Sequence, residues 1–120
     1  MPLRVKRIYE AAAASDGMRI LVDRLWPRGI AKETAKIDLW LKEIAPSNSL
    51  RQRFHAKPEK WDAFLKAYAT ELKAEAATEA AKELRRHIRN GTVTLLYAAR
   101  DEAHNNAVAL KALLTRRKRS

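Results

Sequence analysis

The sequence predicts a small α/β domain: a mixed sheet of about four strands with helices packed on it, in a single three-layer or open-faced unit. Two observations carry this prediction. Short runs of β-branched and large apolar residues alternate along the chain with longer segments of helical periodicity. In addition, 47% of the 120 residues are hydrophobic, which is enough to fill one core. We expect this domain to cover residues 1–115 and a basic disordered tail to follow at residues 116–120.

The first two predicted strands lie near the N-terminus. Apolar and basic residues alternate over residues 3–8, which predicts a half-exposed strand at an edge of the sheet. Residues 11–17 are too few for a crossover helix, so the next strand, residues 18–25, is predicted to return antiparallel to the first. Its Ile-Leu-Val centre indicates burial on both faces.

The later elements follow from periodicity and capping residues. Alternation at residues 37–44 favours a third strand, although Trp40, Leu41 and Ile44 also fit a helical turn. Asp101 is a good N-cap for the last helix. The remaining predicted elements are a short helix, two longer helices, a fourth strand and a closing helix, at residues 47–54, 58–72, 78–89, 92–97 and 101–114.

Composition limits the chemistry and the location of the protein. The chain has no cysteine, so a disulfide, a thiolate metal site and a cysteine nucleophile are excluded. Its three histidines have no close ligand spacing, so we predict neither a metal site nor a cofactor. Since the sequence shows no signal-peptide stretch and no apolar run of membrane-spanning length, we expect a cytoplasmic protein without a membrane partner.

The segment after the second predicted strand is the first candidate site. Arg24 and Arg28 flank Trp26, so two guanidiniums are placed to bind a planar anion or phosphate, and the indole offers a stacking face. A structural interpretation has equal weight. In that interpretation Asp23 and Arg24 form an internal ion pair, and Trp26 closes one end of the core.

The segment after the fourth predicted strand is the second candidate. Arg100, His104 and Asn105 lie where a strand passes into a helix N-terminus, which favours binding of an anion. No glycine-rich phosphate cradle is present. The candidate catalytic groups are Asp23, Asp101 and His104, with His104 as a neutral proton acceptor.

The basic surplus suggests a different partner. Lys and Arg number 25 against 14 Asp and Glu, a net charge of +11. Such a charge attracts nucleic-acid phosphates, and weak binding without sequence preference is the form we expect. The residues that would supply it are Arg85, Arg86, Arg89, Arg116, Arg117, Lys118 and Arg119.

Three separated motifs give the chain a resemblance to a known family. The sequence resembles the YeaO-like family, a branch of domain of unknown function 488, at residues 21–29 (LVDRLWPRG), 37–47 (IDLWLKEIAPS) and 94–101 (TLLYAARD). The resemblance implies a small cytoplasmic bacterial α/β domain. Members of the wider family often carry cysteines at the end of the last strand and a Cys-His-Arg group at the start of the last helix. Here Tyr97 and residues 104–106 (HNN) stand there, so a thiol- or metal-based activity is not implied.

These observations leave three hypotheses for the function. The first is a small enzyme or binding domain whose pocket joins the two candidate segments and takes a phosphorylated or nucleotide-like anion. The alternative is a nucleic-acid-binding or regulatory protein that uses the basic surface and tail. The third is an interaction domain without catalysis, because a fold by itself does not establish a function.

Overall fold

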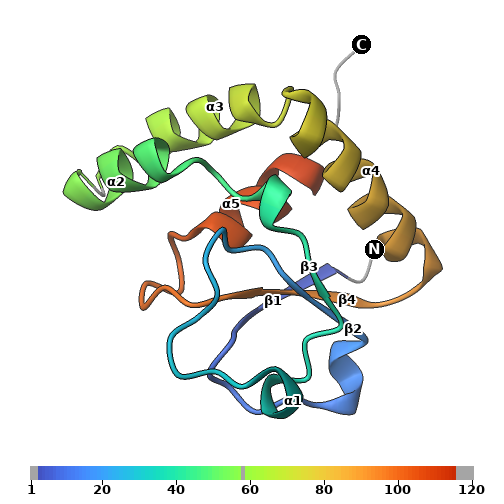
Figure 1. Cartoon of the computed structure of the whole chain (residues 1–120). Helices are drawn as coiled ribbons and strands as arrows, with labels where there is room; N and C mark the ends of the chain where they lie inside the picture. Colours follow the sequence, from blue (N-terminus) through green and yellow to red (C-terminus); the bar gives the residue numbers. More distant parts are fainter. Residues whose placement is uncertain (1–2, 58, 116–120) are drawn as a thin grey trace.

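The computed structural model describes residues 3–57 and 59–115. Its four strands form one sheet in the order β1-β4-β2-β3, with helices before and after β4 (Figure 1). In chain order the elements are β1 (Leu3–Arg7), η1 (Ala14–Asp16), β2 (Met18–Leu21), α1 (Lys32–Ala35), β3 (Leu39–Trp40), η2 (Lys42–Ile44), α2 (Asn48–Ala56), α3 (Trp61–Glu71), α4 (Glu75–Asn90), β4 (Val93–Tyr97) and α5 (Asn106–Thr115).

All strand pairs in this sheet are parallel, which corrects the predicted mixed sheet. The predicted antiparallel return of the second strand is wrong, because β4 lies between β1 and β2 and pairs parallel with both. Two strands that are not neighbours need no hairpin. The ten residues between them include η1, which lies beside β4, where Thr94 Oγ1 donates a hydrogen bond to Asp16 O. The α/β class, the number of strands and the edge position of β1 are confirmed.

The sheet separates two hydrophobic clusters of unequal size. Ile20, Val22 and Leu95 face the larger cluster, which includes buried side chains from α3, α4 and α5. Leu21 and Leu96 face a smaller cluster, where α1 and the loops around it cover the opposite side of the sheet. Figure 1 shows α2 to α5 above the sheet and α1 below it. The central strands β2 and β4 are therefore buried on both faces, and for β2 this confirms the prediction.

Several element boundaries also differ from the prediction: β2 ends at Leu21 rather than at residue 25, and α4 begins at Glu75 rather than at residue 78. β3 is two residues long, because the chain turns into η2 directly after it. α3 begins at Trp61, and Pro58 lies outside the described residues. α5 begins at Asn106, five residues later than predicted. Ser47 caps α2, since its Oγ accepts a hydrogen bond from Leu50 N at 3.1 Å.

Within the described part of the chain, no helix combines the length and the apolar composition that crossing a membrane requires. The predicted tail, residues 116–120, lies outside the described residues.

Candidate functional site

β2 and β4 lie side by side, and the chain leaves them toward opposite faces of the sheet. After β2 it runs to α1, which packs in the smaller cluster, whereas after β4 it runs to α5, which packs in the larger one. Connections that leave neighbouring parallel strands on opposite faces open a crevice at the carboxyl ends of the strands, where α/β proteins bind ligands. The two candidate segments found in the sequence do follow neighbouring strands.

A pocket of about 240 Å³ occupies this crevice. Its walls come from the ends of β2 and β4, from α2 and α3, and from the start of α5. The lining residues are Asp23, Arg51, Phe54, His55, Phe64, Ala98, Ala99, His104, Asn105 and Asn106.

Asp23 links the ends of the two strands to α5. Its Oδ2 accepts a hydrogen bond from Ala98 N at 3.0 Å, and its Oδ1 accepts one from Asn106 Nδ2 at 2.8 Å. Burial raises the pKa of the Asp23 carboxyl above its ordinary value, although these two hydrogen bonds and the charge of Arg51 act in the opposite direction. Asp23 is therefore a fixed, partly desolvated carboxyl group in the pocket wall.

Arg51 brings the positive charge of the pocket from the first turns of α2. Its Nε is buried and has no hydrogen-bond partner among the described residues. Within the same part of the chain no ion pair joins Arg51 to Asp23. Buried polar groups in folded proteins are nearly always hydrogen-bonded, so the Arg51 guanidinium, which lines the pocket, is less well satisfied by the described protein groups than is usual.

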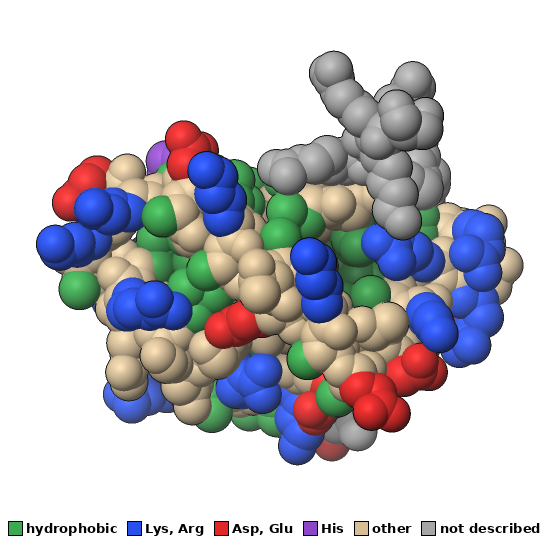
Figure 2. Space-filling view, turned by 90° about the horizontal axis from the view of Figure 1, so that it is seen from above, with side chains coloured by type: hydrophobic (Ala, Val, Ile, Leu, Met, Phe, Trp, Pro, Cys, Tyr) green, Lys and Arg blue, Asp and Glu red, His purple; other side chains and the backbone are tan. Residues whose placement is uncertain are grey.

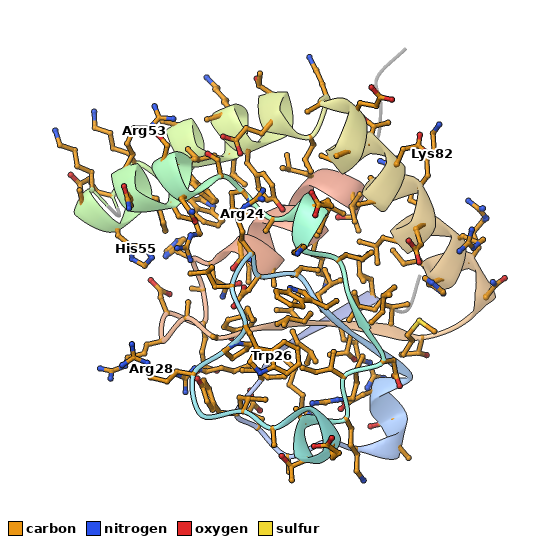
Figure 3. All side chains as sticks on the ribbon, in the orientation of Figure 1. Arg24, Trp26, Arg28, Arg53, His55 and Lys82 are labelled. Carbon is orange, nitrogen blue, oxygen red and sulfur yellow. The ribbon has the colours of Figure 1, made fainter. Side chains whose placement is uncertain are left out.

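Aromatic side chains of α2 and α3 form one wall of the pocket. The Phe54 and Phe64 ring centroids lie 4.7 Å apart, and Trp61 stands edge-on to the His104 imidazole at 4.9 Å. His55 extends from α2 toward the segment after β4 (Figure 3). The pocket thus combines an apolar wall with polar groups that converge from other elements, which is the usual composition of a small-molecule site.

Asp101 and His104 lie at the exposed rim. Asp101 does not cap α5, contrary to the prediction. Its Oδ1 accepts hydrogen bonds from Ala103 N and His104 N, both at 2.9 Å, and these bonds lower the pKa of the carboxyl. His104 Nδ1 lies 3.6 Å from Asp101 Oδ2. The two side chains form one pair at the mouth of the pocket.

Asn105 caps α5 in place of Asp101. Its Oδ1 accepts a hydrogen bond from Val108 N at 2.9 Å, and its Nδ2 donates to Asp101 O. The side chain is 3% exposed, so it fixes the start of the helix beside the pocket. The positive end of the α5 dipole therefore lies at this end of the sheet.

The segment after β2 is dispersed rather than gathered in the pocket (Figure 3). Arg24 donates hydrogen bonds to the carbonyl oxygens of Ala45 and Pro46, at 2.9 and 3.3 Å, and lines a different hollow under α3. Trp26 packs edge-on to Trp40 in the smaller cluster, and Arg28 is exposed at the outer edge of its loop. No ion pair joins Asp23 and Arg24 within the described residues.

The structure thus brings Asp23, His104 and Asn105 together and places Arg24, Trp26, Arg28 and Arg100 outside the pocket. Sequence reasoning missed the contribution of α2. Arg51 and the two residues at i+3 and i+4 from it, Phe54 and His55, share one face of a helix, so the helical period was the signal available for them.

The candidate nucleic-acid residues of the described chain lie on α4. Arg85, Arg86 and Arg89 are all exposed there, but Glu83 shares their face and lies 4.0 Å from Arg86. In the view of Figure 2 basic side chains are scattered over the helical face with acidic ones among them. Arg116, Arg117, Lys118 and Arg119 lie outside the described residues.

Asp23, His55 and His104 line the pocket, but they are not grouped as metal ligands are. Among the described residues, no three His, Asp or Glu side chains lie close enough together to hold a metal ion.

A parallel four-stranded sheet with helices on both faces and a pocket at the ends of its central strands defines a small α/β protein. The family model that matches residues 2–120 is described as the inactive DUF488-N3 subclade, and the chain belongs to this family. The resemblance to the YeaO-like branch of domain of unknown function 488 is thereby confirmed.

Similar proteins cover nearly the whole chain. The uncharacterized protein YeaO of Escherichia coli is 44% identical over 110 residues, which are 92% of this chain and 94% of that protein. Uncharacterized proteins of Mycobacterium tuberculosis and Mycobacterium bovis are each 41% identical over 115 residues, 96% of this chain and 95% of theirs. No solved structure matches.

Proposed function

We propose that the chain binds an anionic small molecule, phosphorylated or nucleotide-like, in the pocket at the ends of β2 and β4. The observation that carries the proposal is Arg51, which lines that pocket, forms no ion pair with a described residue and has no hydrogen-bond partner for its Nε among them. A phosphate or carboxylate oxygen in the pocket would accept a charge-assisted hydrogen bond from this guanidinium.

The phosphate position follows from the groups around Arg51. The N-terminus of α5 adds partial positive charge, and His104 stands at the rim on the same side. The Phe54 and Phe64 rings offer an apolar surface for a planar or sugar-like part of the ligand. Arg51 thus takes the role that sequence reasoning gave to Arg24, Arg28 and Arg100.

Binding rather than catalysis is the activity we propose. Both oxygens of Asp23 already accept hydrogen bonds that hold the carboxyl in place, and the lowered pKa of Asp101 makes that carboxylate a weak base. The description of the matching subclade as inactive supports the same choice.

Calorimetric titration with AMP, ribose 5-phosphate and inorganic phosphate, with adenosine as the uncharged comparison, tests the proposal. We expect the anions to bind and adenosine to bind more weakly. Arg51→Met should lower the affinity for the best anion by tenfold or more, because a hydrogen bond to a charged group contributes about 1.5–3 kcal/mol.

Arg53→Met is the matched control, since Arg53 lies two residues further along α2, is exposed and does not line this pocket. Failure of all three anions to bind the wild-type protein would contradict the proposal. An equal loss of affinity in the Arg53 and Arg51 variants would contradict it as well.

The nucleic-acid alternative makes a different prediction in solution. The three exposed arginines of α4 support only weak binding, because acidic side chains share that helix. Fluorescence anisotropy with labelled DNA over a series of salt concentrations separates the two functions. Under the pocket proposal, Arg85→Gln with Arg89→Gln leaves AMP binding unchanged.

A further inference from the structure

An open groove runs between α2 and α3 on the outer helical side of the molecule, and it shares only Phe54 and Phe64 with the lining of the pocket described above. Its volume is about 350 Å³. Most of its lining is apolar, and Figure 2 looks onto this side. The lining residues are Leu50, Arg53, Phe54, Ala56, Lys57, Lys60, Ala63, Phe64 and Ala67.

Small side chains create the groove. α2 and α3 pack against each other through Phe54 and Phe64, while alanines occupy the outer positions that larger residues would fill. Leu50 and Phe64, at 3% and 5% exposure, form the floor, and Ala56 and Ala63 are exposed on the two sides. Because both sides are exposed, the hollow is a groove open to solvent and accessible to a side chain from outside.

The rim of the groove is basic. Arg53, Lys57 and Lys60 line it, all three are exposed, and none of the described residues that line it is acidic. None of the three forms an ion pair with a described residue. An apolar floor with a rim of one sign complements a partner that carries apolar residues beside acidic ones.

We infer that this groove binds an acidic amphipathic helical segment of a partner protein. Grooves between two helices receive helices through apolar side chains spaced i, i+3, i+4 and i+7. Glu or Asp flanking those side chains would meet the three cations at the rim. The chain's own residues 116–120 are not the occupant, because their sequence, RRKRS, is basic and has no apolar side chain.

Fluorescence anisotropy with a labelled synthetic helix tests the inference. The probe carries Leu at i, i+3, i+4 and i+7 and Glu at its exposed positions. One comparison peptide has Lys in place of Glu, and a second has Ser in place of Leu. We expect the acidic Leu peptide to bind the full-length protein at least tenfold more tightly than either comparison peptide.

The variants locate the binding. Reversing the rim charges (Arg53→Glu, Lys57→Glu, Lys60→Glu) should weaken binding of the acidic peptide at least tenfold. The control combines Arg85→Glu, Arg89→Glu and Lys111→Glu, which reverses three exposed cations elsewhere with the same change in net charge and should retain binding. Ala63→Gln narrows the groove without a change of charge and should also weaken binding.

Three results would overturn the inference. The acidic peptide fails to bind, or the control variant loses as much affinity as the rim variant. In the third, phosphatidylglycerol vesicles bind in a rim-dependent way and the peptide does not, which would assign the surface to lipid. Because none of the substituted residues lines the strand-end pocket, the outcome is independent of the proposed function.

Discussion

Two aspartates at opposite ends of β2 have opposite environments. Asp16, just before the strand, accepts hydrogen bonds from Arg19 Nη1 at 2.6 Å, from Lys6 Nζ at 3.1 Å and from Ala13 N at 3.0 Å. Burial alone would raise its pKa, but the hydrogen bonds and the charge of Lys6 outweigh burial and lower it. Asp23, just after the strand, has a raised pKa.

The arginines near the two aspartates differ in whether their side-chain nitrogens have hydrogen-bond partners. Arg19 is 3% exposed, and besides Asp16 it donates to the carbonyl oxygens of Ala35 and Lys36. Arg51, near Asp23, leaves its buried Nε without a partner among the described residues. At the start of β2, the buried charged groups are hydrogen-bonded to one another and to backbone carbonyls, so this network contributes to folding. At the end of β2, a cation with an unpartnered nitrogen lies beside a pocket, which is typical of a binding site.

The largest effect expected from this comparison is on stability. Asp16→Ala leaves the buried Arg19 without its charge partner, and removing one member of a buried pair costs about 3–5 kcal/mol. Asp23→Ala removes two hydrogen bonds near a pocket and should cost about 1–3 kcal/mol. Urea unfolding of both variants measures the difference.

Glu79→Ala is the control, because its ion pair with Lys82 is exposed and should contribute at most about 1 kcal/mol. If Asp16→Ala lowered the free energy of unfolding no more than Asp23→Ala does, the proposed difference between the two ends of β2 would be contradicted.

The pH dependence of stability should separate the two aspartates by sign. The folded pKa of Asp16 lies below 3.8, so the stability that it contributes is complete above that value and is lost as the pH falls through the folded pKa. The folded pKa of Asp23 lies above 3.8, so its ionised form is disfavoured in the folded state. Protonation of Asp23 therefore adds stability as the pH falls toward 3.8.

Asp16→Asn should accordingly flatten the loss of stability in acid, and Asp23→Asn should steepen it. Urea midpoints of the wild type and both variants, measured between about pH 3 and pH 7, test the two signs. A change of slope in the same direction for both variants would contradict the comparison.

The sequence predicted the local features of this fold better than the pairing of its strands. The central Ile-Leu-Val run of β2 and the alternating pattern of β1 correctly indicated a buried strand and an edge strand. The parallel arrangement depends on β4, residues 93–97, which inserts between them from far along the chain. No local pattern near residues 11–17 reveals that insertion, so the connection was interpreted as a hairpin.

The candidate site shows the same limit. Asp23, His104 and Asn105 were found because strand ends followed by polar residues are a local signal, and the parallel sheet brings those ends together. Arg24, Trp26 and Arg28 were equally attractive in the sequence. Their directions are set by tertiary partners, namely the carbonyls of Ala45 and Pro46 and the ring of Trp40. Arg51 lies on α2 and not after a strand, so its position in the pocket depends on how α2 packs in the tertiary structure.

The smallest expected effect on stability is also the most informative about function. Arg51→Met keeps the unbranched stem and removes a guanidinium whose buried Nε has no partner in the described structure, so the free energy of unfolding should change by less than about 1 kcal/mol. Arg19→Met removes three satisfied hydrogen bonds and leaves Asp16 with less compensation, so it should cost about 3–5 kcal/mol. A residue that contributes little to stability and much to anion affinity is retained for binding. Urea unfolding and AMP titration on the same two variants measure both quantities, and a loss of stability in Arg51→Met equal to that of Arg19→Met would assign Arg51 to folding instead.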